Sequence, residues 1–217
     1  MVNLSNFSIG CDPEVFVKRR GTTNKKIICA HDLVKGTKKE PYPVKDGAIQ
    51  VDGMALEFNT DPMNFTQWQD EPDNAREFSR RVFSVMTGLK ENLGKDYSIV
   101  MEPYHDFDPE YLKAQPEIAR ELGCDPDMNA YTMQPNAMPE GDVFFRTTAG
   151  HIHIGWGKDI PIDHPDHLAV CAQTVKALDA YIGVLSTVLD PDVRRRQLYG
   201  KAGAFRPKPY GVEWRTP

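Results

Sequence analysis

Two histidines lie two positions apart in the segment TTAGHIHIGWG, residues 147–157. Because successive side chains of a strand point to opposite faces, His151 and His153 share one face, while Ile152 and Ile154 share the other. One face of such a strand is apolar, and the other carries imidazole nitrogens that bind metals or form hydrogen bonds. The spacing therefore predicts a strand with one core face and one functional face.

Carboxylates recur in three other expected strands, each beside large apolar residues. They are Glu14 in DPEVFV, Glu57 in MALEFN and Glu213 in VEWR. A single acid of this kind usually faces solvent on a half-exposed sheet, whereas burying an unpaired carboxylate is very costly. The recurrence favours convergence on one sheet face, which requires cations, and oxygen-rich ligation favours Mg²⁺ or Mn²⁺ over zinc. Glu102 in VMEP and Asp12 are further candidates, although Asp12 is equally suited to cap its own turn before Pro13.

Cations are dense in the tail from residue 194 onward, where they alternate with glycines at positions 200, 203 and 211. They are Arg194, Arg195, Arg196, Lys201, Arg206, Lys208 and Arg215. Arginine binds phosphate and carboxylate oxygens in a bidentate manner, and glycine lets the backbone approach a ligand closely. Carboxylates with a divalent metal beside arginines are typical of nucleoside triphosphate chemistry, and a basic surface loop is the alternative. The chain has no P-loop, kinase or dinucleotide-binding signature, so the common nucleotide folds are not supported.

The elements that must position these residues are segregated along the chain rather than strictly alternating. Strands are expected over residues 7–19 with a turn at Gly-Cys-Asp-Pro, over Ile27–Ala30, over 48–60 with a turn or bulge at Asp52-Gly53, over 97–103, over 143–156 and at VEWR. Helices are expected from Asp73 or Asn74 to Gly94, within 110–123, and from about His164 to Leu189, the last one buried. This pattern favours an α+β fold with a mostly antiparallel sheet.

The composition is that of a globular domain, with 40% hydrophobic and 26% charged residues and a net charge of −5. We expect no nucleic-acid surface, no membrane span of about 20 apolar residues and no signal peptide, and therefore a cytoplasmic protein. The four cysteines, at positions 11, 29, 124 and 171, show no CxxC spacing and predict free thiols.

Five segments carry a resemblance to a known family. They are DPEVF, ALEFNTDP, GCDPDMNA, RTTAGHIHIG and YGKAGAFRPKPYGVEWRTP. Over nearly the whole chain, and in the same order, the sequence resembles the phage-type carboxylate–amine ligases (amidoligases), in the superfamily of glutamine synthetase and glutamate–cysteine ligase. HIHIG together with AGAFRPKPYGVEWR is the specific part. The resemblance implies one glutamine synthetase-like catalytic domain over residues 1–217, with a curved, mostly antiparallel sheet backed by helices.

The resemblance also implies roles for individual residues. Metal ligands would be Glu14, Glu57, His151 and Glu213, with His153, Asp12 and Glu102 behind them or at the substrate. Arg215 and Arg206 would act in catalysis, and Arg206, Lys208, Lys201 and Arg196 would contact ATP phosphates. The assignment of the two histidines is open to reversal. Glutamine synthetase has paired acids on its early strands, whereas here only Asp12 lies two residues from Glu14 or Glu57.

The implied reaction is phosphoryl transfer from ATP to a substrate carboxylate, with Mg²⁺ or Mn²⁺ as cofactor. An amine then attacks the acyl phosphate and leaves an amide. The expected partners are small-molecule or peptide carboxylates and amines, in the host cytoplasm if the chain is phage-encoded. Relatives are expected to continue beyond Arg215, so a C-terminal truncation is one expectation. A metal-dependent hydrolase and a non-catalytic nucleotide-binding module of the same fold are the alternatives, and the hydrolase leaves the arginine-rich tail unexplained.

Overall fold

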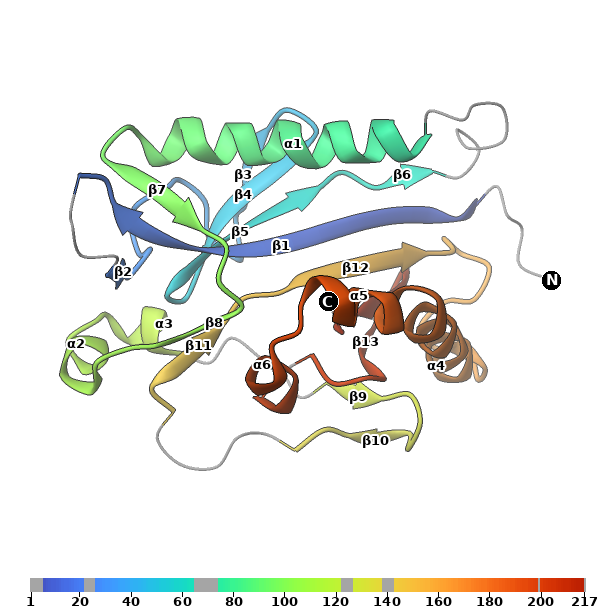
Figure 1. Cartoon of the computed structure of the whole chain (residues 1–217). Helices are drawn as coiled ribbons and strands as arrows, with labels where there is room; N and C mark the ends of the chain where they lie inside the picture. Colours follow the sequence, from blue (N-terminus) through green and yellow to red (C-terminus); the bar gives the residue numbers. More distant parts are fainter. Residues whose placement is uncertain are drawn as a thin grey trace.

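The computed structural model describes residues 6–21, 26–64, 74–121, 127–137, 143–198 and 200–216. They form an α+β fold built on a 12-stranded sheet, and every ladder between its strands is antiparallel. Figure 1 shows the long strand β1 (Ser8–Arg19) running through the middle of the molecule, with helix α1 (Asn74–Leu93) on one side. The mostly antiparallel α+β fold predicted from the sequence is therefore confirmed.

The main path of the sheet follows the order β10-β9-β13-β14-β12-β1-β5-β4-β3. Its strands, besides β1, are β3 (Tyr42–Val44), β4 (Gly47–Asp52), β5 (Ala55–Thr60), β9 (Met128–Asn129), β10 (Gln134–Pro135), β12 (Gly150–Gly155), β13 (Ala204–Lys208) and β14 (Gly211–Trp214). Three strands pair with β1 off this path: β2 (Ile27–Ile28), β6 (Met63–Asn64) and β7 (Tyr97–Val100). A separate two-stranded sheet joins β8 (Tyr104–Asp106) to β11 (Phe145–Thr147).

Strand β1 joins the two halves of the sheet because it changes partners along its length. Residues 8–13 pair with β12, and the following Glu14 and Val15 pair with β5. The turn expected at Gly-Cys-Asp-Pro is wrong, since β1 continues through it. Pro13 is the last residue of the ladder to β12, where its missing N–H does least harm. On the edge of β1 that faces away from β12, the Cys11 N–H donates to Thr60 Oγ1 at 3.0 Å.

Two helices cover the apolar face of the two halves. Helix α1 packs Val85, Leu89 and Leu93 against a core that includes Val15 of β1 and Leu56 of β5. Helix α4 (His167–Leu178) covers the other half, where Cys171, Ala172 and Val175 pack against Ile154, Phe205, Val212 and Trp214. Because strand side chains alternate, burying these residues under the helices sends their neighbours in sequence to the opposite face.

Several expected elements differ in their limits. The strand expected over 48–60 is the hairpin β4–β5, which turns at Gly53 (φ 57°) and Met54. The strand expected over 143–156 divides into β11 and β12, which belong to different sheets. The region 110–123 contains two short helices, α2 (Pro109–Lys113) and α3 (Glu117–Arg120). Asn74 is the first residue of α1, Asp73 lies outside the described residues, and Gly94 (φ 81°) follows the last residue of α1 as predicted.

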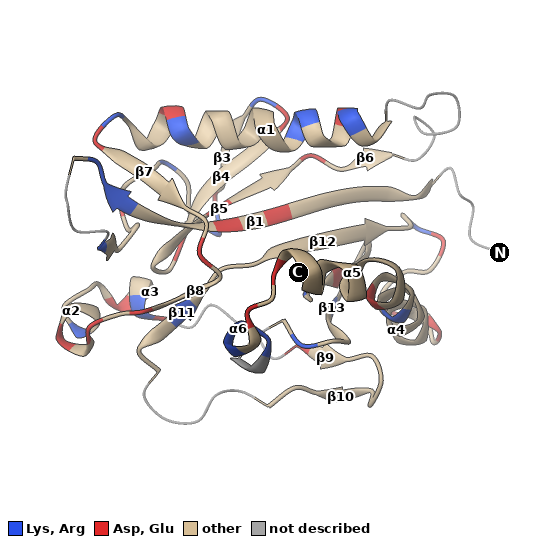
Figure 2. Ribbon diagram, viewed as in Figure 1, with Lys and Arg blue, Asp and Glu red and all other residues tan. Residues whose placement is uncertain are grey.

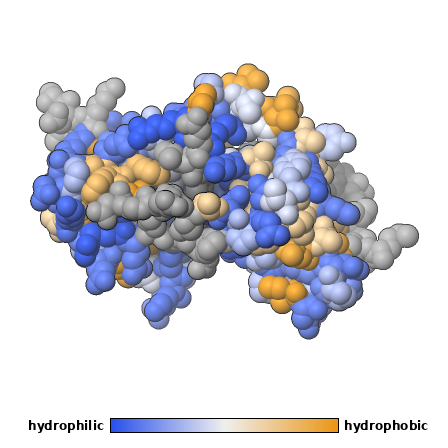
Figure 3. Space-filling model, turned by 90° about the horizontal axis from the view of Figure 1, so that it is seen from below, coloured by the Kyte–Doolittle hydropathy of each residue, from blue (hydrophilic) through white to orange (hydrophobic). Residues whose placement is uncertain are grey.

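The long apolar helix is only partly buried, which corrects the sequence-based expectation. It continues from α4 through the π-helical turn η3 (Asp179–Gly183) into α5 (Val184–Leu189), and α6 (Val193–Leu198) follows. Helix α4 packs on β13 and β14, whereas the contacts of α5 are chiefly with the preceding turn of the same helix, and Val188 is 80% and Leu189 88% exposed. By length and composition alone, His167–Leu189 is apolar enough to cross a membrane, contrary to the expectation of no such run. Seen from below, hydrophobic areas interrupt a largely hydrophilic surface (Figure 3).

Candidate active site

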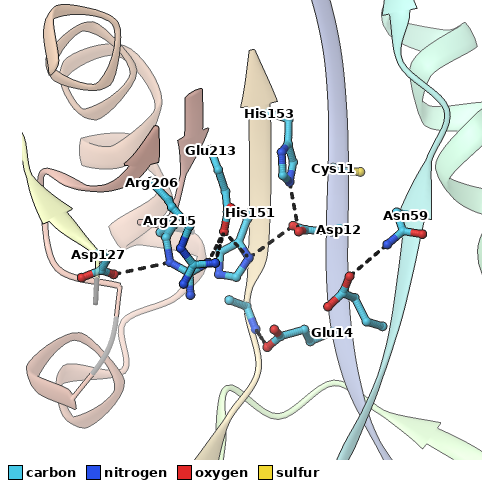
Figure 4. Close-up of polar contacts among 12 residues, drawn as sticks. Cys11, Asp12, Glu14, Asn59, Asp127, His151, His153, Arg206, Glu213 and Arg215 are labelled. Atoms are coloured by element: carbon cyan, nitrogen blue, oxygen red, sulfur yellow. Dashed lines mark hydrogen bonds and ion pairs between the residues drawn. The ribbon is translucent and has the colours of Figure 1, made fainter. Parts of the chain in front are cut away.

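The polar face of the sheet brings together acids, imidazoles and cations from strands that are distant in sequence. Asp12 lies opposite His151, Glu14 opposite Glu57, and Glu213 opposite His153. Figure 2 shows the acidic positions in the middle of β1, and Figure 4 shows the side chains pointing toward one another. They line a cavity of about 290 Å³. Its charged walls are Asp12, Glu14, Lys38, Asp52, Glu57, Glu121, Arg146, His151, Arg206, Lys208, Glu213 and Arg215.

The first cluster consists of Asp12, His151 and Glu213, whose potential ligand atoms lie within 4.8 Å of one another. His151 Nδ1 is 3.2 Å from Asp12 Oδ1 and 3.6 Å from Glu213 Oε1. Burial lowers the pKa of His151, which favours the neutral imidazole that metals bind. Burial alone would raise the pKa of Asp12, but hydrogen bonds with His151 and His153 outweigh it and hold the pKa well below its usual range. This cluster therefore combines an ionised carboxylate with a neutral imidazole.

The second cluster consists of Glu14, Asp52 and Glu57, also within 4.8 Å of one another. Gln50 Nε2 and Asn59 Nδ2 each donate to Glu57 Oε1 at 2.9 Å. Burial and the nearby carboxylates raise the pKa of Glu57 to about 8 and that of Glu14 well above its usual range. The surrounding protein groups therefore do not offset the charge that Glu14 and Glu57 carry when ionised, and a bound cation would favour their ionised forms.

Three cations from the β13–β14 region surround the carboxylate of Glu213, which is 1% exposed. Lys208 Nζ lies 2.6 Å from Glu213 Oε2, and an Arg206 nitrogen lies 3.6 Å from Oε1. Arg215 pairs with the same carboxylate and, through Nε, with Asp127 Oδ2 at 3.4 Å. Glu213 therefore connects the first cluster to a group of cations suited to phosphate oxygens.

Most of the predicted site residues line this cavity. His153 does not line it but lies 3.0 Å from Asp12, and three further residues lie apart from it. Glu102 is half exposed, lies 3.8 Å from His105, and follows β7, which pairs with the far end of β1. Arg196, on α6, pairs with Asp190, and Lys201 is exposed. None of the three lines the cavity, so the geometry brings them into no contact with the two clusters.

Sequence reasoning missed Asp52 and Lys38, which both line the cavity. Lys38 Nζ lies 2.7 Å from Asp52 Oδ1. Asp52 is two residues from Gln50 on β4 and so shares its face, and Gln50 pairs with Glu57. Asp52 therefore adds an acid beside Glu57 from the neighbouring strand. The pairing of β4 with β5 could have placed Asp52 near Glu57. That pairing could not be predicted while Asp52-Gly53 was equally compatible with a turn and with a bulge.

The raised pKa of Glu57 predicts a pH-dependent stability in metal-free protein. The pKa of Glu57 is about 8 in the folded state and about 4.3 in the unfolded state. As pH rises from about 4.3 to about 8, the unfolded state loses its proton first, so the free energy of unfolding falls. We therefore expect Glu57→Gln to raise the melting temperature at pH 8 by about 5 °C or more, and by much less at pH 5. His151 gives the opposite trend up to about pH 6.5, and this trend is common to wild type and variant. The difference between them therefore reports the charge of Glu57 together with its effect on Glu14. The exposed Glu110→Gln is the control, and equal effects at both pH values would contradict the prediction.

A comparison with protein families supports the resemblance seen in the sequence. Residues 145–217 match the model of the family described as phage phiEco32-like COOH.NH2 ligase-type 2. A search of curated proteins finds no match to the chain. The matched segment contains β12, β13 and β14, and with them both histidines, Glu213 and the three cations around it. Over residues 145–217 the chain is therefore similar to the phage phiEco32-like carboxylate–amine ligases, which supports the resemblance seen in the sequence.

Proposed function

We propose that this protein is an ATP-dependent carboxylate–amine ligase that forms an amide through an acyl phosphate. The family match supports the ligase class, and one observation carries the dependence on ATP. Two clusters of buried and half-buried acids, one of them with His151, share a single cavity with Arg206, Lys208 and Arg215. Metal-binding acids facing cations are the arrangement that phosphoryl transfer requires. We extend the proposal to the fold: the sheet, with helices on one face and this cavity on the other, would be a glutamine synthetase-like catalytic domain.

The residues present fit divalent cations such as Mg²⁺ or Mn²⁺. The ligand atoms of each cluster lie within 4.8 Å of one another, and the donor set is mainly carboxylate oxygen. The first cluster would hold one ion, and Glu14, Asp52 and Glu57 a second. Such ions would neutralise the triphosphate and polarise the phosphoryl oxygens.

The cations of the chain would act on the phosphates directly. Arg206 and Lys208 are suited to the ATP phosphates, and Arg215 to the group in transfer, because their positive charge offsets the charge that develops there. A substrate carboxylate oxygen attacks the terminal phosphorus, the bond to the bridging oxygen breaks, and ADP leaves. The amine then attacks the carbonyl carbon, inorganic phosphate leaves with the electron pair of the broken C–O bond, and the proton that the nitrogen loses goes to the departing phosphate.

The remaining wall of the cavity is the proposed place for the acid and the amine. Glu121, Arg146 and Thr147 form part of it. Arg146 donates to the backbone carbonyls of Val143, Phe145 and Arg120, which fixes its guanidinium at the cavity wall. A fixed arginine beside the reacting groups suits recognition of a substrate carboxylate.

Trapping with hydroxylamine tests this function, because hydroxylamine replaces the amine and converts an acyl phosphate to a hydroxamate. The protein would be incubated with ATP, Mg²⁺, hydroxylamine and pools of amino acids and short acidic peptides. The proposal predicts ADP and hydroxamate in equal amounts, both dependent on a carboxylate and on Mg²⁺. Metal-dependent hydrolysis of an amide or ester without any need for ATP would instead identify a hydrolase.

A further inference from the structure

A line of three side chains connects the first cluster to the protein surface. The Tyr210 hydroxyl lies 2.5 Å from His153 Nδ1, and His153 Nε2 lies 3.0 Å from Asp12 Oδ2. Figure 4 shows His153 directed at Asp12, away from the group formed by His151, Glu213 and Arg215. Tyr210 belongs to the turn between β13 and β14, and its carbonyl accepts a hydrogen bond of 2.9 Å from the Trp156 N–H. This hydrogen bond ties the turn that carries Tyr210 to the end of β12, the strand that carries His153.

This order of groups selects one tautomer of His153. An ionised carboxylate only accepts hydrogen bonds, so a hydrogen bond from the ring to Asp12 requires the proton on Nε2. The other ring nitrogen, Nδ1, then accepts, and the hydroxyl of Tyr210 is its donor. The opposite tautomer would set a lone pair of Nε2 against the lone pairs of Asp12. The hydroxyl and the carboxylate thus favour the same proton position from both ends of the ring.

The position of Asp12 gives this arrangement a consequence for the metal site. One carboxylate oxygen, Oδ2, faces His153 Nε2 at 3.0 Å, while the other, Oδ1, lies 3.2 Å from His151 Nδ1 in the first cluster. His153 is therefore placed to orient a ligand rather than to be one. Groups behind a metal ligand fix its orientation, and their loss typically costs about 10- to 100-fold in metal affinity.

We propose that Tyr210 is a positioning residue for the divalent-metal site: its hydroxyl donates to His153 Nδ1, directs the Nε2–H to Asp12, and so turns Asp12 Oδ1 toward His151 and Glu213. The inference deepens the proposed function and rests on it, because it requires a metal at the first cluster. Tyr210 is 42% exposed and belongs to none of the three hydrophobic cores, so loss of its hydroxyl leaves core packing intact.

The test uses Tyr210→Phe, with Tyr181→Phe as a control at another exposed tyrosine, 78% exposed, on η3. Mn²⁺ alone is the probe, measured by electron paramagnetic resonance of free and bound ion. We expect Tyr210→Phe to raise the dissociation constant about tenfold and Tyr181→Phe to leave it unchanged. The same Tyr210→Phe change made in a His153→Ala background is expected to add nothing, since the tyrosine acts through His153. Unchanged affinity in Tyr210→Phe, or an equal loss in the His153→Ala background, would overturn the proposal.

A second measurement separates this inference from the proposed function because it needs no metal. Nitrogen-15 NMR of labelled histidine distinguishes an Nε2–H ring from an Nδ1–H ring and from a doubly protonated one. In metal-free wild type we expect His153 to be the Nε2–H tautomer, and in Tyr210→Phe to become a mixture. A different form of the ring in wild type, or the same form in both proteins, would overturn the role of Tyr210. If wild type shows the expected tautomer but binds no Mn²⁺, the metal site of the proposed function is what fails, and the positioning role fails with it.

Discussion

Asp12→Asn is expected to weaken Mn²⁺ binding by at least about a hundredfold and to remove ligase activity. Asp12 is the carboxylate that both histidines contact, at 3.2 Å from His151 and 3.0 Å from His153. Asparagine keeps its size but removes the negative charge and presents an amide N–H₂ group to one of these partners. The loss therefore acts on the metal site rather than on packing. Calorimetric titration of Mn²⁺ and the hydroxamate assay measure the two effects.

Asp61→Asn is the matched control for this prediction. Asp61 is an exposed aspartate immediately after β5, outside the cavity. It is expected to leave both metal affinity and activity unchanged. If Asp12→Asn retained wild-type affinity for Mn²⁺ in a folded protein, the first cluster would not be the metal site, whatever the residual activity.

Arg215→Lys is expected to lower the rate of hydroxamate formation by about 10²- to 10³-fold, with little change in Mn²⁺ affinity. The guanidinium of Arg215 spans two carboxylates, Glu213 on one side and Asp127 on the other, and it is 3% exposed. Lysine keeps the charge but has no planar fork, so it cannot hold both partners and a phosphate oxygen together. The effect should therefore lie in catalysis rather than in metal binding.

The control for this change is Arg194→Lys, in the same basic tail. Arg194 is exposed on α6 and forms a bidentate pair with Asp106, with both distances 2.6 Å. Exposed pairs of this kind contribute little, so activity should stay at the wild-type level. Wild-type activity in Arg215→Lys would show that the transferred group does not meet this arginine.

The faces of the strands could be predicted from the sequence because the two-residue alternation is local. Glu14, Glu57, His151 and Glu213 each precede a large apolar residue. The packing of these next residues, Val15, Phe58, Ile152 and Trp214, under α1 and α4 places all four functional side chains on the opposite face. The antiparallel fold followed from the segregation of strands and helices. Neither inference needed to know which strands are adjacent.

The inferences that failed are those that depended on contacts between distant segments. Pro13 ends the ladder between β1 and β12 but does not end β1 itself. The residues around Pro13 cannot show this, because it depends on where β12 begins and ends. Asp52 and Lys38 reach the cavity through the hairpin register and through the segment before β3. The exposure of α5 likewise depends on where β13 and β14 end beneath the helix. Glu102 has the same local pattern as Glu57, but β7 pairs with β1 beyond the cavity.

The most direct test of the central claim is calorimetric titration of ATP into the protein with and without Mg²⁺, repeated for Glu57→Ala and Arg206→Ala. Glu57 belongs to the second cluster and Arg206 to the cations around Glu213, so the two variants test both halves of the cavity. The proposed function predicts binding of ATP that requires Mg²⁺ and that is weakened at least about tenfold in each folded variant. ATP binding that is independent of Mg²⁺ and unchanged in both variants, or no binding by folded wild type, would contradict it.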